Sequence, residues 1–295
     1  MDFIAMFLDY IQYERRNSAH TFVAYKTDLE QYSDFLLSQN LSIEQATYRD
    51  IRNWLIALME DDDNSTRTIN RKISTLKTFY RFLLRNKHIE VNPMDKVIAP
   101  KQSKRLTNFV SEQDMSKLFE QLEFPDSFEG KRDRIILELF YATGIRLSEL
   151  IQIKKGDLDL YSGTIKIFGK RKKERIIPIV LQMIVQLQDY LNILEKNFGT
   201  IDYNANIFVT DEGKPVYPKL VYRIVRKYLD CVSTVDKRSP HVIRHTFATH
   251  LLDNGAELLA IKELLGHSSL AATQVYTHTS IEKIKETYKQ AHPRA

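Results

Sequence analysis

Hydrophobic residues recur at three- and four-residue spacing through the first hundred residues of the chain. This spacing places apolar side chains on one side of a helix, and it predicts four helices, at residues 2–15, 18–38, 42–60 and 65–86. The last three begin at residues that cap helices well, namely Ser18, Ser42 and Ser65. Four helices of this length predict a small bundle.

The helical periodicity then stops and returns in a different context. Residues 91–107 hold two prolines and several cations without sustained periodicity, which indicates a linker. A helix restarts at Ser111, and another ends at Gly144. Residues 158–180 alternate in hydrophobicity and are rich in isoleucine, which predicts a β-hairpin within a small sheet. Helical spacing resumes after Val180.

This pattern predicts a mostly α protein with two domains. Residues 1–100 form an N-terminal helical bundle domain, residues 101–106 a linker, and residues 107–295 a mainly helical domain with a small antiparallel β-sheet. No run approaches the roughly 18 apolar residues of a membrane span. The N-terminal segment lacks the basic start of a secretory signal, so a cytoplasmic location is expected. The single cysteine, Cys231, is interpreted as a core thiol.

The formal net charge of +5 is unevenly distributed along the chain. Residues 66–105 contain eleven lysines and arginines against two acids, which indicates a polyanionic partner such as DNA or RNA. The helix at 65–86 carries a basic stripe opposite its apolar side, made of Arg67, Arg71, Lys77, Arg81 and Arg85. A charged helix face is often only solvated surface. Five cations without an intervening acid favour contact with a phosphate backbone.

Residues 239–255, SPHVIRHTFATHLLDNG, form a predicted helix that carries polar groups on and beside its apolar face. Ser239 is a suitable N-cap and Pro240 suits the first turn, so the positive end of the helix dipole lies beside His241. Such a helix start favours an anion. Arg244 falls at the edge of the apolar face, where its guanidinium needs an anionic partner. That partner is either a phosphate or a carboxylate elsewhere in the fold.

The histidines of this segment raise the alternative of a zinc site. His241 and His245 have the i, i+4 spacing of a metalloprotease helix, but Val242 stands where that motif needs glutamate. Zinc is therefore not expected. His245 is interpreted as a hydrogen-bonded core residue, and His250 as facing a neighbouring element or solvent.

A tyrosine follows further along, at position 276, in a short helix predicted after Gly266 and His267. Its spacing alone favours a packing role. A phenol has a pKa near 10 and is a poor nucleophile unless cations or a base assist it.

Four segments of the second domain resemble the tyrosine recombinase (phage integrase) family, and specifically its Xer branch. They are YATGIRLSEL at 141–150, HVIRH at 241–245, LLGHSSLAATQVYTH at 264–278 and the closing HPRA. The match extends over roughly 107–295, and NSAHTFVAYKTDLEQYSDFL at 17–36 resembles the N-terminal domain of the family. Several ordered motifs at the proper intervals make the resemblance specific.

The resemblance implies a chemistry for six residues. Tyr276 would attack a DNA phosphodiester and form a 3′-phosphotyrosyl link with a free 5′-hydroxyl. Arg146 and Arg244 would bind the nonbridging oxygens, where charge grows in the transition state. His241 and His267 would complete the phosphate pocket, with His241 handling the tyrosine proton. Lys170, in the hairpin turn, would protonate the leaving 5′-oxygen.

The hairpin turn departs from the family pattern. Xer relatives usually have GKGNKER there, whereas this chain has GKRKKER, with Arg171 and Lys172 in place of glycine and asparagine. The added cations make Lys172 and Lys173 rivals for the role of acid, although position favours Lys170. A second role for Arg171, Lys172 and Lys173 is contact with DNA phosphates, which can coexist with catalysis.

The resemblance also implies the biological role and the partners. The phosphotyrosyl bond conserves the energy of the broken ester, so no ATP, metal or other cofactor is expected. The expected assembly is a tetramer on two double-stranded DNA sites, of identical subunits or with a sister recombinase, and a DNA translocase is the expected activator. Residues 280–295 would dock on a neighbouring subunit, with packing on their own domain as the alternative.

Three functions are compatible with this resemblance. The first is a Xer recombinase for chromosome dimer resolution and segregation, which the lack of an added arm-binding domain favours. The second is an integrase or invertase of a mobile element. The third is a catalytically silent DNA-binding accessory factor, which the intact set of six residues disfavours.

Overall fold

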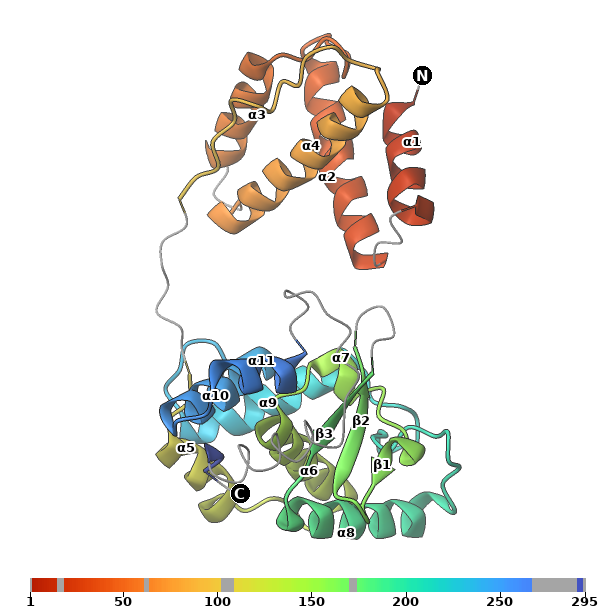
Figure 1. The fold of residues 1–295 in the computed structure, drawn as a ribbon, viewed down its shortest axis with the longest axis vertical. Coiled ribbons are helices and arrows are strands. Elements are labelled where there is room, and N and C mark those ends of the chain that lie inside the picture. The colour runs from red at the N-terminus through yellow and green to blue at the C-terminus, as the bar shows by residue number, and fades with distance from the viewer. Residues whose placement is uncertain are drawn as a thin grey trace. The chain divides into compact units, whose positions relative to one another are not determined.

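The computed structural model describes residues 2–14, 19–60, 64–101, 109–169, 174–266 and 291–293. The chain forms two compact units, residues 1–105 and 106–295, each with its own hydrophobic core (Figure 1). In the described ranges, helices predominate in both units, and a small antiparallel sheet occurs in the second, as the hydrophobic pattern predicts.

The first unit contains the four predicted helical segments. They are α1 (Phe3–Asp9) with the π-helical turn η1 (Tyr10–Glu14), α2 (Ala19–Ser38), α3 (Tyr48–Glu60) and α4 (Thr66–Arg85). Ser65 caps α4 as expected, because its hydroxyl accepts a 3.2 Å hydrogen bond from the Thr68 amide. Ser18 lies outside the described residues.

The predicted start of the third helix at Ser42 is wrong. The carbonyl of Thr47 accepts the first helical hydrogen bond, from the Ile51 amide, so α3 begins at Tyr48. The carboxylate of Asp50 accepts hydrogen bonds from both the amide and the hydroxyl of Thr47, at 2.9 and 2.7 Å. These two bonds stabilise the later start, whereas Ser42 lies in a turn with its amide donating to Gln45.

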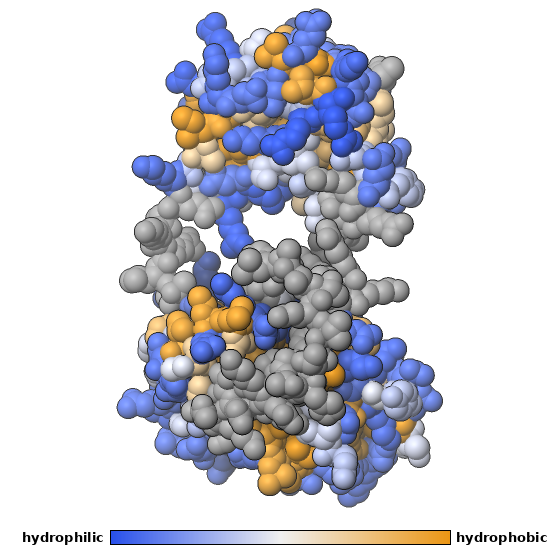
Figure 2. Space-filling view, in the orientation of Figure 1, coloured by the Kyte–Doolittle hydropathy of each residue, from blue (hydrophilic) through white to orange (hydrophobic). Residues whose placement is uncertain are grey.

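An aromatic core holds the helices of the first unit together. Phe7, Tyr32, Trp54, Phe79 and Tyr80 are all buried and pack ring against ring. The hydroxyls of Tyr32 and Tyr80 are 2.7 Å apart and satisfy each other inside the core. The surface of this unit is mostly hydrophilic in the view of Figure 2.

The second unit begins with two helices whose ends match the sequence pattern. Ser111 caps α5 (Glu112–Ser116), which continues into the π-helical turn η2 (Lys117–Gln121). Helix α6 (Phe128–Thr143) ends at Gly144, whose φ of +59° favours glycine. A Cβ at Gly144 would lie 2.4 Å from the Phe247 ring, so the close packing also requires glycine there.

The sheet follows the short helices α7 (Leu147–Leu150) and η3 (Lys155–Asp157). Strands β1 (Leu158–Asp159), β2 (Thr164–Phe168) and β3 (Glu174–Pro178) are antiparallel in the order β1-β2-β3. Ile165 pairs with Ile177, and both side chains are buried. The predicted hairpin is therefore confirmed, and its turn at 170–173 lies outside the described residues.

The remaining described helices are α8 (Leu181–Phe198), α9 (Pro218–Val232), α10 (Pro240–Asp253) and α11 (Leu258–Leu265). Helix α6 is buried along almost its whole length, and α8 and α10 pack against it (Figure 1). Ser239 and Pro240 open α10 as predicted, although the Ser239 hydroxyl makes no capping hydrogen bond.

Two further features concern membrane-spanning helices and the cysteine. No helix within the described ranges combines the length and the apolar character needed to cross a bilayer. The interpretation of Cys231 as a core thiol is wrong, because Cys231 is exposed on α9 and its thiol donates to the Lys227 carbonyl.

Candidate active site

Arg244 is held by the ends of two helices. Its side chain is buried in α10, with 8% of the residue exposed. Nη1 donates to the Gly144 carbonyl at 2.5 Å, and Nη2 donates to the Leu265 carbonyl at 2.7 Å. These carbonyls belong to the C-terminal ends of α6 and α11, where helices carry partial negative charge. Two backbone carbonyls, and no carboxylate of the described residues, are therefore the hydrogen-bond partners of this guanidinium.

The same environment affects the pKa of Arg244. Burial of the guanidinium lowers the pKa to about 10, and the nearby charges of Arg146 and Arg175 act in the same direction. Glu149 opposes them. The guanidinium thus stays charged at neutral pH in a site with excess positive charge, which a bound anion would stabilise.

Arg146 contacts the same helix end as Arg244. It is the residue before α7, its side chain is 27% exposed, and its Nη2 donates to the Gly266 carbonyl at 3.3 Å. Because Gly266 directly follows Leu265, Arg146 and Arg244 both bind the end of α11. The structure therefore brings together two arginines that lie almost a hundred residues apart in the sequence.

The sequence interpretation missed a buried carboxylate, Glu149, and its strongest partner, Arg175. Arg175 on β3 donates from Nη1 to Oε1 at 3.0 Å and from Nη2 to Oε2 at 2.7 Å. Arg146 donates from Nη1 to Oε1 at 2.8 Å, and its amide donates to Oε2 at 2.8 Å. Arg175 also donates from Nε to the Leu264 carbonyl at 3.1 Å.

These contacts keep Glu149 ionised. Burial of the carboxyl group favours its neutral form, but the hydrogen bonds and charges of Arg175 and Arg146 outweigh burial and lower the pKa of Glu149 to about 2. Two signals in the sequence point to this pair. Glu149 stands three residues after Arg146, in the position of a capping box, and Arg175 is a charge on the isoleucine-rich buried face of β3.

Three arginines and one carboxylate leave an excess of positive charge beside the end of α11. We call Arg146, Glu149, Arg175 and Arg244 the arginine cluster. His241 is exposed at the start of α10. Six of the residues named from the sequence lie outside the described residues: Lys170, Arg171, Lys172, Lys173, His267 and Tyr276. Gly266, the last described residue before His267, contacts the cluster directly.

The other histidines of α10 differ in burial. His245 is half-buried. His250 is buried, and its Nδ1 is 2.9 Å from the Tyr141 hydroxyl. Phe109 and Tyr141 lie edge-on to the His250 ring. Burial lowers the pKa of His250, so it packs as a neutral ring against neighbouring elements, as expected from its position.

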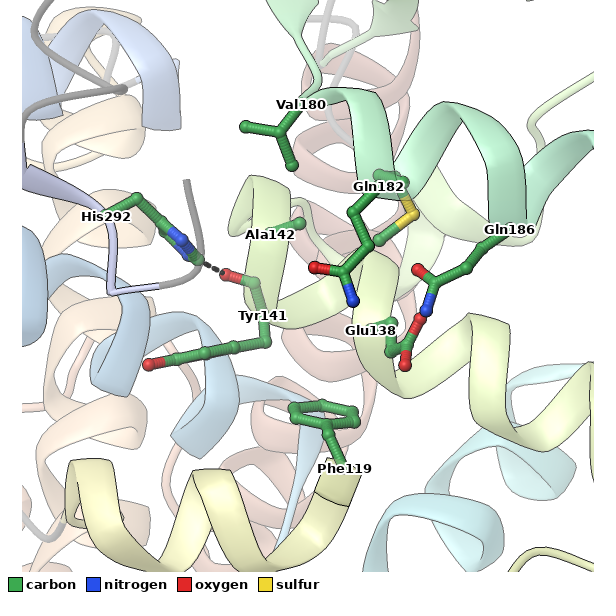
Figure 3. A pocket seen from close by; sticks show the side chains of 9 residues that line it. Phe119, Glu138, Tyr141, Ala142, Val180, Gln182, Gln186 and His292 are labelled. Atoms are coloured by element: carbon green, nitrogen blue, oxygen red, sulfur yellow. Dashed lines mark hydrogen bonds between the residues drawn. The ribbon is translucent and has the colours of Figure 1, made fainter.

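Ala291 and His292, near the C-terminus, pack on the second unit of the chain. Ala291 lies in the core of this unit, and Nε2 of His292 donates to the Tyr141 carbonyl at 3.1 Å. Figure 3 shows His292 pointing at Tyr141 beside a pocket lined by Phe119, Glu138 and Gln182. Residues 291–293 therefore follow the second of the two expected alternatives, packing on their own domain. Residues 280–290 lie outside the described residues.

The basic stripe of α4 is exposed along most of its length. Arg67, Arg81 and Arg85 are exposed and Lys77 is half-buried. Arg71 is also exposed, but Asp28 of α2 accepts a hydrogen bond from its Nη1. The sequence of α4 has no acid among these cations, but the fold brings Asp28 of α2 into contact with Arg71. The expectation of a stripe without acids is corrected at this position.

Among the described residues, no group of His, Cys, Asp and Glu side chains is arranged to hold a metal ion. The described part of the candidate site consists of guanidinium groups, helix ends and one carboxylate. Such a site is suited to binding a phosphodiester.

Comparison with known proteins identifies the family. Residues 102–283 match the phage integrase family, and residues 4–87 match the phage integrase N-terminal SAM-like domain. The tyrosine recombinase XerC of Bacillus subtilis strain 168 is 40% identical over 100% of this chain and 97% of its own length. The tyrosine recombinase XerC of Chlorobaculum parvum is 37% identical over 98% of this chain and 94% of its own length.

Solved structures share the fold. The XerH site-specific recombinase bound to a palindromic difH substrate aligns with a TM-score of 0.73 at 20% identity, covering 92% of this chain and 80% of XerH. The Tn1549 transposon integrase in complex with transposon right end DNA aligns with a TM-score of 0.71 at 21% identity, covering 97% and 99%. The chain therefore belongs to the phage integrase family and is a site-specific tyrosine recombinase.

Proposed function

We propose that this recombinase resolves chromosome dimers by exchanging strands between two DNA sites in the cytoplasm. Relatives named XerC match almost the whole chain at 36–40% identity. The mobile-element rival has weaker support, because the Tn1549 and lambda integrases share the fold at only 17–21% identity. The domain assignment follows the same family: residues 1–100 bind the core DNA site, 101–106 link, and 107–295 catalyse.

The observation that carries the catalytic assignment is the meeting of Arg146 and Arg244 at the end of α11. The chain continues from there into His267 and, nine residues later, Tyr276. A phosphodiester bound by both guanidinium groups would lie next to the segment that carries the tyrosine. Each guanidinium has five N–H donors, so the bonds to backbone carbonyls leave donors for nonbridging oxygens.

The arginine cluster supplies what the transition state needs. Attack by the Tyr276 oxygen on phosphorus increases the negative charge on the two nonbridging oxygens, and preorganised donors stabilise that charge without having to reorient. His241 accepts the phenolic proton, and His267 donates to the phosphate. Lys170 protonates the 5′-oxygen as its bond to phosphorus breaks, so the products are a 3′-phosphotyrosine and a 5′-hydroxyl.

Strand exchange then reverses the same chemistry with a new 5′-hydroxyl as the nucleophile. The bond energy of the phosphodiester is kept in the phosphotyrosine, so the proposed reaction uses neither ATP nor a metal. Two duplexes require four tyrosines, so the proposed assembly is a tetramer of identical subunits or of this chain with a sister recombinase. A DNA translocase is its proposed activator.

A nicked suicide substrate tests the enzymatic activity. The duplex should carry the site that the protein occupies in cells, mapped by crosslinking, and the buffer should contain EDTA and no nucleotide. We expect a covalent protein–DNA complex that survives denaturing electrophoresis. Occupancy of one chromosomal locus supports dimer resolution, and occupancy of mobile-element ends supports the rival. Binding without any covalent complex would identify a silent accessory factor.

The basic stripe offers a separate prediction for DNA binding. Changing Arg67, Lys77 and Arg81 to glutamate should weaken DNA binding and flatten its salt dependence. Each lost phosphate contact reduces the slope of log K against log salt concentration by roughly 0.9. Arg71 is left unchanged, because a glutamate there would face the buried Asp28. Binding isotherms at several salt concentrations measure both quantities.

Lys214→Glu is the control for this prediction, since Lys214 is an exposed loop residue that pairs with Glu212. It changes the net charge without changing the stripe, and its salt slope should match the wild type. An unchanged affinity and slope in the triple variant would show that the stripe is only solvated surface.

A further inference from the structure

Glu149 is shared by two arginines in unequal proportions. Arg175 occupies both carboxylate oxygens with its two terminal nitrogens, whereas the Arg146 side chain reaches only Oε1. The Arg146 amide takes the remaining site on Oε2. The carboxylate therefore accepts four hydrogen bonds, which fills its lone-pair capacity. Because only 5% of Glu149 is exposed, water cannot replace these donors.

We propose that Arg175 is a positioning residue for strand cleavage: by holding Glu149, it prevents this carboxylate from capturing the guanidinium of Arg146. This proposal rests on the proposed function, in which Arg146 binds the scissile phosphate. Arg175 itself is buried and makes its contacts with the protein, so it acts through Arg146.

Loss of Arg175 would leave Glu149 without two of its four hydrogen-bond donors. A buried carboxylate that loses two charged donors must find replacements or become protonated. Arg146 lies on the same short helix turn and already touches Oε1 at 2.8 Å. A small rotation of its guanidinium would give the bidentate pair that arginine and carboxylate prefer. The donors of Arg146 would then point at Glu149 and away from a phosphate.

Charge leads to the same conclusion. Glu149 carries one negative charge, and in the wild type Arg175 and Arg146 share it. Arg146 therefore keeps part of its attraction for an incoming anion. Without Arg175, the whole carboxylate charge would pair with Arg146.

Arg175 also holds the backbone on which Arg146 and Arg244 converge. Its Nε donates to the Leu264 carbonyl, one residue before the carbonyl that binds Arg244. Gly266 packs against it so closely that a Cβ there would lie 3.2 Å from Arg175 Nη1. One side chain of β3 thus supports both Glu149 and the end of α11.

The test compares Arg175→Gln with the double variant Arg175→Gln/Glu149→Gln. Single-turnover cleavage of the nicked suicide substrate is measured at saturating enzyme, and DNA affinity is measured separately by titration. Arg175→Gln should cleave at least about tenfold more slowly than wild type while its DNA affinity stays within about twofold, because Arg146 is misdirected and the DNA surface is intact. The double variant should cleave severalfold faster than Arg175→Gln, because a neutral amide does not capture Arg146.

Three results would overturn the proposal: wild-type cleavage by Arg175→Gln, a double variant no faster than the single one, or a loss of affinity that parallels the loss of rate. If Arg175→Gln does not fold, Arg175→Lys replaces it with the same comparison. Lysine keeps the charge but cannot hold both oxygens, so Glu149→Gln should again accelerate cleavage. A wild type that forms no covalent complex would instead refute the proposed function.

Discussion

Replacing Arg244 with lysine should slow DNA cleavage by about two to three orders of magnitude, the usual effect of removing a donor to a developing oxyanion. The guanidinium binds the Gly144 and Leu265 carbonyls and still has donors for a phosphate. A lysine ammonium has three donors at one point and cannot span both carbonyls and the phosphate. Single-turnover cleavage of the nicked substrate at saturating enzyme measures this effect.

Arg226→Lys is the matched control for Arg244→Lys. Arg226 lies on α9, its side chain is 70% exposed, and its i, i+4 pair with Asp230 contributes little. This variant should cleave at the wild-type rate. DNA affinity should change far less than the rate in Arg244→Lys, since one contact among many is altered. A wild-type cleavage rate in Arg244→Lys would show that Arg244 does not bind the scissile phosphate.

Replacing Glu149 with glutamine should destabilise the second unit by about 3–5 kcal/mol, the usual effect of leaving a buried charge without its partner. Arg175 is 6% exposed and would lose both of its charged acceptors. Urea unfolding followed by circular dichroism measures the change. Glu212→Gln, which removes the partner of the exposed Lys214, is the control and should unfold close to the wild type.

The pH dependence of unfolding gives an independent check on Glu149. Its pKa is lowered in the folded protein to about 2, from an ordinary value of 4.5. Such a group stabilises the fold fully above pH 4.5, and this contribution, on the order of 3 kcal/mol, is lost as the pH falls from about 4.5 to 2. Glu149→Gln should lack this component of acid sensitivity. Identical acid profiles for variant and wild type would contradict the assignment.

Helix ends and the hairpin were predictable because their signals are local. Ser65, Ser111 and Gly144 mark ends through hydrogen bonds and backbone angles within a few residues of themselves. The hairpin follows from alternation, which depends only on the pleat of the strand. The predicted helix start at Ser42 was wrong for the same reason. A good capping residue does not exclude a better cap at Thr47, a few positions later.

The partners of the site arginines were not predictable in this way. Arg175 and its partner Glu149 are 26 residues apart in the sequence, and Arg71 and its partner Asp28 are 43 residues apart. Periodicity assigns a side chain to a face but does not say which distant element covers that face. Arg244 illustrates a second limit, since its partners are backbone carbonyls, which every residue type possesses. The motifs predicted Arg146 and Arg244 as site residues, and the tertiary structure supplied the contacts that orient these two side chains.

The central claim, that Tyr276 is the nucleophile, is tested most directly by comparing Tyr276→Phe with wild type on the nicked suicide substrate. Tyr161→Phe, which removes a fully exposed hydroxyl between β1 and β2, is the matched control. We expect covalent protein–DNA complexes from wild type and Tyr161→Phe, none from Tyr276→Phe, and DNA binding by all three. Covalent complexes formed by Tyr276→Phe at the wild-type level would contradict the claim.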